Sequence, residues 1–97
     1  MRNYEACCIF RVEDDKFKAG KDAVLEVIQK LGAQNMKEDD MQVRTLAYEI
    51  NKTYSGHYYL FSFQMTPENA HKIEHDVRLI PELMRIMVSR IEEPVTV

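Results

Sequence analysis

Long apolar runs are missing from this chain of 97 residues, and glycine and proline are scarce, with three of each. No apolar stretch approaches the roughly 18 residues that a membrane span requires, so we expect neither a signal peptide nor a transmembrane segment. The low glycine and proline content, without any low-complexity tract, argues against long disordered linkers. We therefore expect a single domain over residues 1–92, followed by a short tail at residues 93–97.

Cysteine is equally scarce, because the chain has only Cys7 and Cys8, which are adjacent. Adjacent side chains in a strand point to opposite faces, so we expect neither a disulfide between them nor a shared metal. Two cysteines that form no disulfide fit a reducing, intracellular compartment.

His71 and His75 have a spacing that can bind a metal on a helix, but they lie among charged residues typical of a solvated helix face. We expect no metal and no other cofactor.

Motifs of the common enzyme classes are missing as well. The sequence has no Gly-rich phosphate loop, no nucleophile elbow and no pair of carboxylates that can be assigned to one cleft. We therefore expect neither enzymatic activity nor a small-molecule substrate.

Basic residues are also few, with 13 Lys and Arg against 16 Asp and Glu and a formal net charge of −3. This balance argues against coating nucleic acid by bulk charge, although a local basic patch remains compatible with it.

The pattern of apolar residues predicts elements in the order βαββαβ. Strands are expected at residues 4–12, 34–50, 57–65 and 83–91, with a bend near residues 39–40 and a loop at residues 51–56. Helices are expected at residues 14–32 and from Thr66 to about Pro81, and Gly20 should weaken the first helix by about 1 kcal/mol. The strand residues expected in the core are Tyr4, Ala6, Cys8 and Phe10, then Tyr59, Phe61, Phe63 and Met65, and from the last strand Met84, Ile86 and Val88. The helix residues expected to face this core are Phe17, Val24, Val27, Ile28 and Leu31, and then Ala70, Ile73 and Val77.

Right-handed crossovers then give a ferredoxin-like α+β fold, a four-stranded antiparallel sheet with two helices on one face. The first and third strands should be central. The other face should be open, and exposed apolar patches usually mark a partner surface, although scattered apolar residues without a partner are the alternative. The apolar residues expected on the open face are Cys7, Ile9, Tyr58, Leu60 and Met87.

The RNA-recognition module shares this fold and carries a signature in its third strand. That signature needs a basic residue, Gly, an aromatic residue, a small residue and a second aromatic residue. The run at residues 55–59 is Ser-Gly-His-Tyr-Tyr, in which the basic residue is missing and a Tyr fills the small position. We therefore exclude this module.

The central hairpin, residues 44–63, resembles that of the bacterial small-subunit ribosomal protein six family. Both contain Arg-x-Leu-Ala-Tyr-x-Ile-x-Lys, a short loop ending in Gly, and an aromatic strand. Residues 1–5, 76–79 and 83–88 are also similar to the start, second helix and last strand of that family. One departure is the run at residues 41–44, Met-Gln-Val-Arg, where the family often has an aromatic residue or Leu, then Gly, then two basic residues.

The resemblance implies a structural component of the small ribosomal subunit, located on the cytoplasmic ribosome. It would bind the central domain of 16S ribosomal RNA together with small-subunit ribosomal protein eighteen. An acidic chain could do so because the partner contributes much of the anchoring. The resemblance makes the open face the candidate surface for the protein partner. The candidate rRNA-binding residues that it implies are Arg2, Arg44, Lys52, Arg78 and Arg85.

An alternative of another class is a ferredoxin-like ligand- or metal-binding regulator that forms a homodimer through the open sheet face. A bound metal or a stable homodimer would favour this alternative. Binding of a 16S fragment only in the presence of the partner protein would favour the ribosomal hypothesis.

Overall fold

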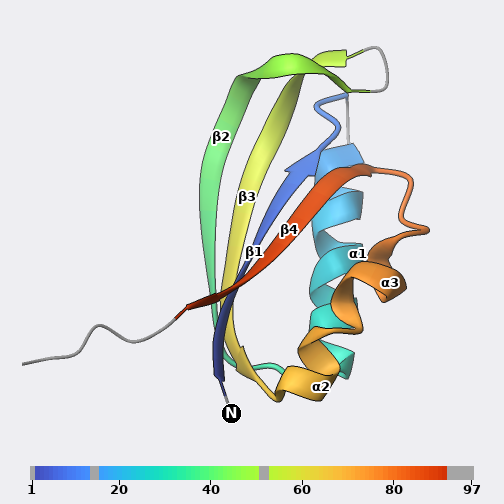
Figure 1. Ribbon diagram of the computed structural model, residues 1–97. Helices are drawn as coiled ribbons and strands as arrows, with labels where there is room; N and C mark the ends of the chain where they lie inside the picture. The colour runs from blue at the N-terminus through green and yellow to red at the C-terminus, as the bar shows by residue number, and fades with distance from the viewer. Residues whose placement is uncertain (1, 14–15, 51–52, 92–97) are drawn as a thin grey trace, which may run out of the picture.

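The computed structural model describes residues 2–13, 16–50 and 53–91, and leaves the side chains of residues 47–50 and 53–54 undescribed. The elements follow one another as β1 (Arg2–Phe10), α1 (Lys16–Lys30), β2 (Gln34–Ile50), β3 (Thr53–Met65), α2 (Pro67–Ala70), α3 (Ile73–Val77) and β4 (Leu83–Ile91) (Figure 1). Lys52 and the tail at residues 93–97 therefore lie outside the described part of the chain. None of the helices described is long and apolar enough to cross a membrane.

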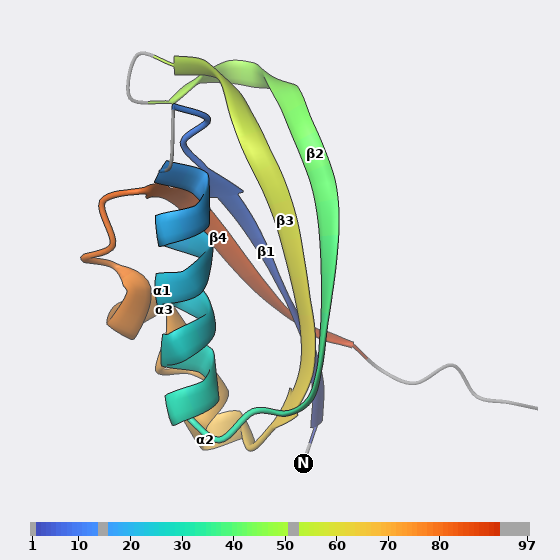
Figure 2. The same cartoon turned by 180° about the vertical axis from the view of Figure 1, so that it is seen from behind.

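The four strands form one sheet in the order β2-β3-β1-β4, and every neighbouring pair is antiparallel. This confirms the ferredoxin-like α+β prediction, with the first and third strands in the centre. All three helices lie on the same side of the sheet, and its other side is open, as Figures 1 and 2 show from opposite directions.

The core lies between the sheet and α1, α2 and α3. The eight residues expected there from β1 and β3 are buried, from complete burial of Ala6 to 8% exposure of Tyr59. From β4, Ile86 and Val88 are only partly buried, and Leu83 rather than Met84 packs against the core, because the register with β1 shifts between Ile9 and Phe10. The helices contribute Val24, Ile28, Ala70, Ile73 and Val77 to the buried core. The alternation of side chains along a strand thus divides the two faces of the sheet as the sequence predicts.

Gly20 of α1 is buried against Phe10 and Glu82. A Cβ atom at this position would lie 2.8 Å from Phe10 Cδ1 and 2.8 Å from Glu82 Cβ. The glycine therefore allows close packing against the end of β1 and the residue before β4. Helix propensity alone accounts only for the cost of this glycine to the helix.

Several boundaries differ from the prediction. β1 begins and ends two residues earlier than expected, because Arg2 and Asn3 pair with the end of β3 while Arg11 donates its backbone N–H to Glu82. β3 starts at Thr53 rather than at residue 57, since the ladder with β2 continues through Ser55 and Gly56. The second predicted helix is two short helices, α2 and α3, separated at residues 71–72.

A β-bulge interrupts β2 close to the predicted bend. Asp40 pairs with Tyr59 and Gln42 pairs with Tyr58, so Met41 is an extra residue on this strand. Gln42 has a φ of 71°, in the left-handed region that costs a residue with a Cβ about 1–2 kcal/mol. The extra residue reverses the alternation. From Lys37 to Asp39 the odd-numbered residues of β2 face the open side, and from Gln42 to Arg44 the even-numbered residues do.

Candidate functional site: the open face of the sheet

The register arranges the open face in rows across the strands. The row nearest the β2–β3 hairpin contains Gln42, Tyr58, Ile9 and Arg85, and Arg44 lies beside it, opposite Gly56. The next row contains Asp39, Leu60, Cys7 and Met87. A third row, Lys37, Ser62, Glu5 and Ser89, is polar. The open face thus changes from arginine-rich to apolar to polar along the strands.

The apolar row brings together three of the five residues predicted for the partner surface. Met87 is 61% exposed, and Cys7 and Leu60 are partly exposed. Cys7 pairs directly with both Leu60 and Met87, so the three side chains are neighbours on adjacent strands. They form a contiguous apolar strip, which we call the apolar row.

Ile9 lies on the open face but is only 9% exposed. Its Cγ2 atom occupies the space above Gly56, 2.4 Å from where a Cβ would lie, and Leu46 Cδ2 is 3.4 Å from the same point. Leu46 is likewise buried, at 7% exposure. Ile9 and Leu46 therefore form a small second core under the hairpin. The sequence alone does not assign Leu46 this role, because the expected loop at residues 51–56 includes Gly56.

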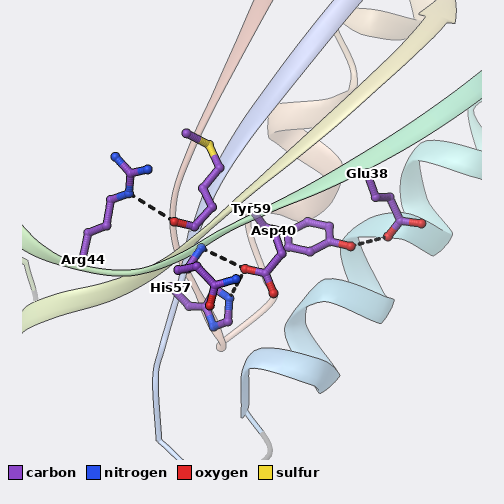
Figure 3. Close-up of polar contacts among 7 residues, drawn as sticks. Glu38, Asp40, Arg44, His57 and Tyr59 are labelled. Carbon is purple, nitrogen blue, oxygen red and sulfur yellow. Dashed lines mark hydrogen bonds and ion pairs between the residues drawn. The ribbon is translucent and has the colours of Figure 1, made fainter.

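Arg44, one of the predicted RNA-binding residues, is fixed in place on the open face. Its Nε donates a hydrogen bond to the carbonyl oxygen of Met41 at 3.1 Å (Figure 3). Its Cζ lies 5.9 Å from the centroid of the Tyr58 ring. An arginine in such a contact keeps its terminal N–H groups available for a phosphate or a base edge.

The other predicted RNA-binding residues do not gather around Arg44. Arg85 lies on the open face in the row of Tyr58, and Arg78 caps the C-terminal end of α3. Both line a shallow cleft of about 280 Å³ between α3 and β4. Arg2 pairs with Met65, nine residues along β3 from the Gly56 partner of Arg44, a distance of about 30 Å. The structure thus separates Arg2 from the hairpin end.

A polar cluster lies on the helix side of the same hairpin (Figure 3). His57 Nε2 is 2.6 Å from Asp40 Oδ1, and the His57 ring stacks on Phe17 of α1 at a centroid distance of 3.5 Å. The hydrogen bond with His57, and then that from the Gln42 backbone N–H, lower the pKa of Asp40.

Tyr59 belongs to the same region of the helix side. Its hydroxyl donates to Glu38 Oε1 at 2.9 Å. Burial, and then this hydrogen bond, raise the pKa of Tyr59 to about 12. The hydroxyl is therefore held in its neutral, donating form at physiological pH.

The two cysteines have opposite surroundings, as adjacent residues of a strand should. Cys8 is fully buried in the core, and its burial raises the pKa of its thiol far above the ordinary value. Cys7 is in the apolar row, where partial burial and then the Glu5 carboxylate raise the pKa of its thiol, while Arg44 lowers it. Cys7 is therefore a neutral, weakly reactive part of the open face.

Comparison with known proteins now decides the family. A family model described as Ribosomal protein S6 matches residues 3–90. The chain belongs to the ribosomal protein S6 family. Small ribosomal subunit protein bS6 of Treponema denticola is 34% identical over 93 residues, covering 96% of this chain and 100% of the relative. The protein of the same name from Treponema pallidum (strain Nichols) is 33% identical over 92 residues, covering 95% of this chain and 99% of the relative.

A solved structure gives the same result for the S6 fold. The crystal structure of 30S ribosomal protein S6 from Thermotoga maritima superimposes with a TM-score of 0.80 at 25% sequence identity, covering 93% of this chain and 87% of that one. The family resemblance inferred from the hairpin is thereby confirmed. S6 family members are ribosomal proteins of the small subunit, a structural rather than a catalytic class.

The two histidines spaced four apart do not share one helix. His71 lies in the turn between α2 and α3, and His75 Nδ1 is 3.3 Å from Asp76 Oδ1 on an exposed surface. Within residues 2–13, 16–50 and 53–91, no group of three or more His, Cys, Asp and Glu side chains could hold a metal ion.

Proposed function

We propose that this S6 family protein binds the central domain of 16S ribosomal RNA together with small-subunit ribosomal protein eighteen, and that its open face serves both partners. One observation carries the proposal: an exposed apolar row lies directly beside the Arg44–Tyr58 pair and Arg85. The apolar row offers a surface for the protein partner, and the neighbouring arginines offer contacts for RNA. As a small-subunit protein, the chain acts on the ribosome in the cytoplasm.

The charge of the chain supports a shared interface. With a formal net charge of −3, the protein lacks the bulk positive charge that drives strong RNA binding alone. A few arginines can position RNA, but each neutralised phosphate adds only a limited, salt-dependent increment. The partner must therefore supply most of the electrostatic attraction. The exposed Met87 side chain, with Leu60 and Cys7 beside it, favours a protein at this position.

The test is filter binding of a 16S central-domain fragment, with and without purified protein eighteen, at two salt concentrations. We expect weak binding by either protein alone and tight binding by the pair, with a steep salt dependence. Equal binding of the RNA by this chain alone and by the pair would contradict the proposal that the partner supplies most of the electrostatic attraction. A stable homodimer that protein eighteen does not displace would instead favour the regulator hypothesis.

A variant locates the protein-binding surface within that assay. Leu60→Asp places a charge in the apolar row and should abolish formation of the pair, and with it RNA binding, without unfolding the domain. Ser62→Asp is the matched control, because it adds the same charge to the same face of β3 in the polar row. Equal loss of pairing in both variants, or pairing intact in Leu60→Asp, would show that the apolar row is not the contact.

A further inference from the structure

The β2 bulge connects the two faces of the sheet through a single peptide group. This group joins the carbonyl of Met41 to the N–H of Gln42, and no cis peptide bond occurs in the part of the chain described. In a planar trans peptide the carbonyl and the N–H point in opposite directions. Whatever holds one of them therefore fixes the direction of the other.

Asp40 holds the N–H end of this peptide. Its Oδ1 accepts a hydrogen bond from Gln42 N at 2.9 Å and lies 2.6 Å from His57 Nε2 (Figure 3). The imidazole is itself restrained, because its ring stacks on Phe17 at an interplanar angle of 2° and its side chain is only 14% exposed. Asp40 thus has support from β3 and, through His57, from α1.

Arg44 uses the carbonyl end of the same peptide. Its Nε donates to the Met41 oxygen at 3.1 Å, and its guanidinium lies over Tyr58. Gln42 needs external support in this arrangement, since its φ of 71° is unfavourable for a residue with a Cβ. The hydrogen bond from Gln42 to Asp40 supplies that support.

We propose that Asp40 and His57 are positioning residues for Arg44, acting through the Met41–Gln42 peptide from the opposite side of the sheet. They hold the bulge in the conformation that directs the Met41 carbonyl toward the arginine and keeps the guanidinium over Tyr58. The geometry alone carries this inference. Its consequence for RNA rests on the function proposed above, in which Arg44 contacts RNA.

The positioning is tested first without RNA, by NMR of the Arg44 side chain in Asp40→Ala. We expect the Nε proton of Arg44 to exchange with water several-fold faster than in the unmodified protein, and its ring-current shift from Tyr58 to shrink. Asp40→Asn should stay close to the unmodified protein, because the amide oxygen can still accept from Gln42 N. Asp22→Ala, which removes the same charge from the exposed side of α1, should change nothing. Equal exchange in Asp40→Ala and Asp22→Ala would overturn the proposal.

The second measurement is a double-mutant cycle with RNA and protein eighteen. Removing an acidic residue should by itself strengthen RNA binding slightly, yet we expect Asp40→Ala to weaken it several-fold. In an Arg44→Ala background the same change should have no weakening effect, because the group that it positions is gone. A weakening that persists without Arg44 would contradict the proposed route.

The two measurements separate the inference from the function on which it draws. If Arg44→Ala leaves RNA binding unchanged while Asp40→Ala changes the NMR signals of Arg44, the positioning stands and the RNA role of Arg44 is wrong. If Arg44→Ala weakens RNA binding but Asp40→Ala leaves the NMR signals of Arg44 unchanged, the RNA role stands and the positioning is wrong.

Discussion

The Arg44 guanidinium lies over the Tyr58 ring, with Cζ 5.9 Å from the ring centroid. Arg44 came from the set of residues predicted to bind RNA, and Tyr58 came from the set predicted to bind a protein. Their contact means that the two proposed surfaces are one continuous surface. A cation over an aromatic ring at an exposed site contributes about 0.5–1 kcal/mol, enough to favour one orientation of the arginine.

Arg44 should therefore contribute one phosphate contact to the complex with RNA and protein eighteen. Arg44→Ala is expected to lower the slope of log affinity against log salt by about 1, and Tyr58→Leu should lower it by less. Tyr58→Phe should preserve the slope, since the ring remains. Lys37→Ala is the control, because Lys37 lies on the same face in the polar row. If Lys37→Ala reduces the slope as much as Arg44→Ala, the assignment of the arginine is wrong.

Replacing Gly20 distinguishes close packing from helix propensity. Propensity alone predicts that Gly20→Ala stabilises the domain by about 1 kcal/mol. The 2.8 Å approach of a Cβ to Phe10 and Glu82 predicts a loss of about 1–3 kcal/mol, because that region is already filled. Chemical denaturation measures the free energy of unfolding. Ala19→Gly, at the exposed neighbouring position, should lose about 1 kcal/mol through propensity alone.

Gln42 occupies a backbone conformation that glycine adopts at no steric cost. We expect Gln42→Gly to raise the free energy of unfolding by up to about 1 kcal/mol, the relief at φ 71° being partly offset by the entropy of a more flexible unfolded chain. Asn35, at φ 53°, is the matched control. Its side chain donates to Gln64 Oε1 at 2.7 Å, so Asn35→Gly should gain less or lose stability. Destabilisation by Gln42→Gly would contradict this account of the bulge.

Cys7 should report on occupation of the apolar row. Burial and Glu5 raise the pKa of its thiol, so alkylation should be slow at neutral pH and should accelerate as the pH rises. Protein eighteen should protect the thiol, and prior alkylation should prevent formation of the pair. Mass spectrometry follows the modification, and Cys7→Ser controls for reaction at the buried Cys8. Equal alkylation rates with and without the partner would place the contact elsewhere.

Tyr59 should titrate above the ordinary range of a tyrosine. The chain has five, and burial together with the Glu38 hydrogen bond raises the pKa of Tyr59 to about 12. Because the unfolded state loses this proton near pH 10, its contribution to stability is complete below pH 10 and is lost as the pH rises toward 12. Ultraviolet absorbance of tyrosinate should show a late step that disappears in Tyr59→Phe. A titration unchanged by that substitution would contradict the assignment.

Most of the fold could be predicted because two simple periodicities govern it. Alternation in β1 and β3 predicts eight core residues, and all eight are buried in the structure. The helical spacing of Val24 and Ile28 likewise predicts the side of α1 that is buried. The right-handed crossover rule then places the first and third strands in the centre, where the structure has them. These features depend on local chemistry repeated along the chain, which a single sequence records directly.

The site was less predictable because it depends on contacts between distant residues. Gly56 indicates a loop by its residue type, whereas its missing side chain makes room for Ile9 within a strand. The family resemblance implies the five candidate RNA-binding residues but not their separation in space, and Arg2 lies about 30 Å from the part of the hairpin that carries Arg44. The support of Arg44 by Asp40 and His57 requires a bulge that alternation alone does not reveal.

The bulge in β2 also decides which side of the sheet Arg44 reaches. If Met41 paired in the ladder like its neighbours, the alternation established by Lys37 and Asp39 would continue by residue number. Val43 would then face the open side, and Arg44 would face the helices. Deleting Met41 would instead remove the bulge and keep Val43 and Arg44 opposite their present partners, so Arg44 would stay on the open side without the carbonyl that its Nε contacts. The bulge thus absorbs one surplus residue in the strand, and the arginine keeps its side of the sheet.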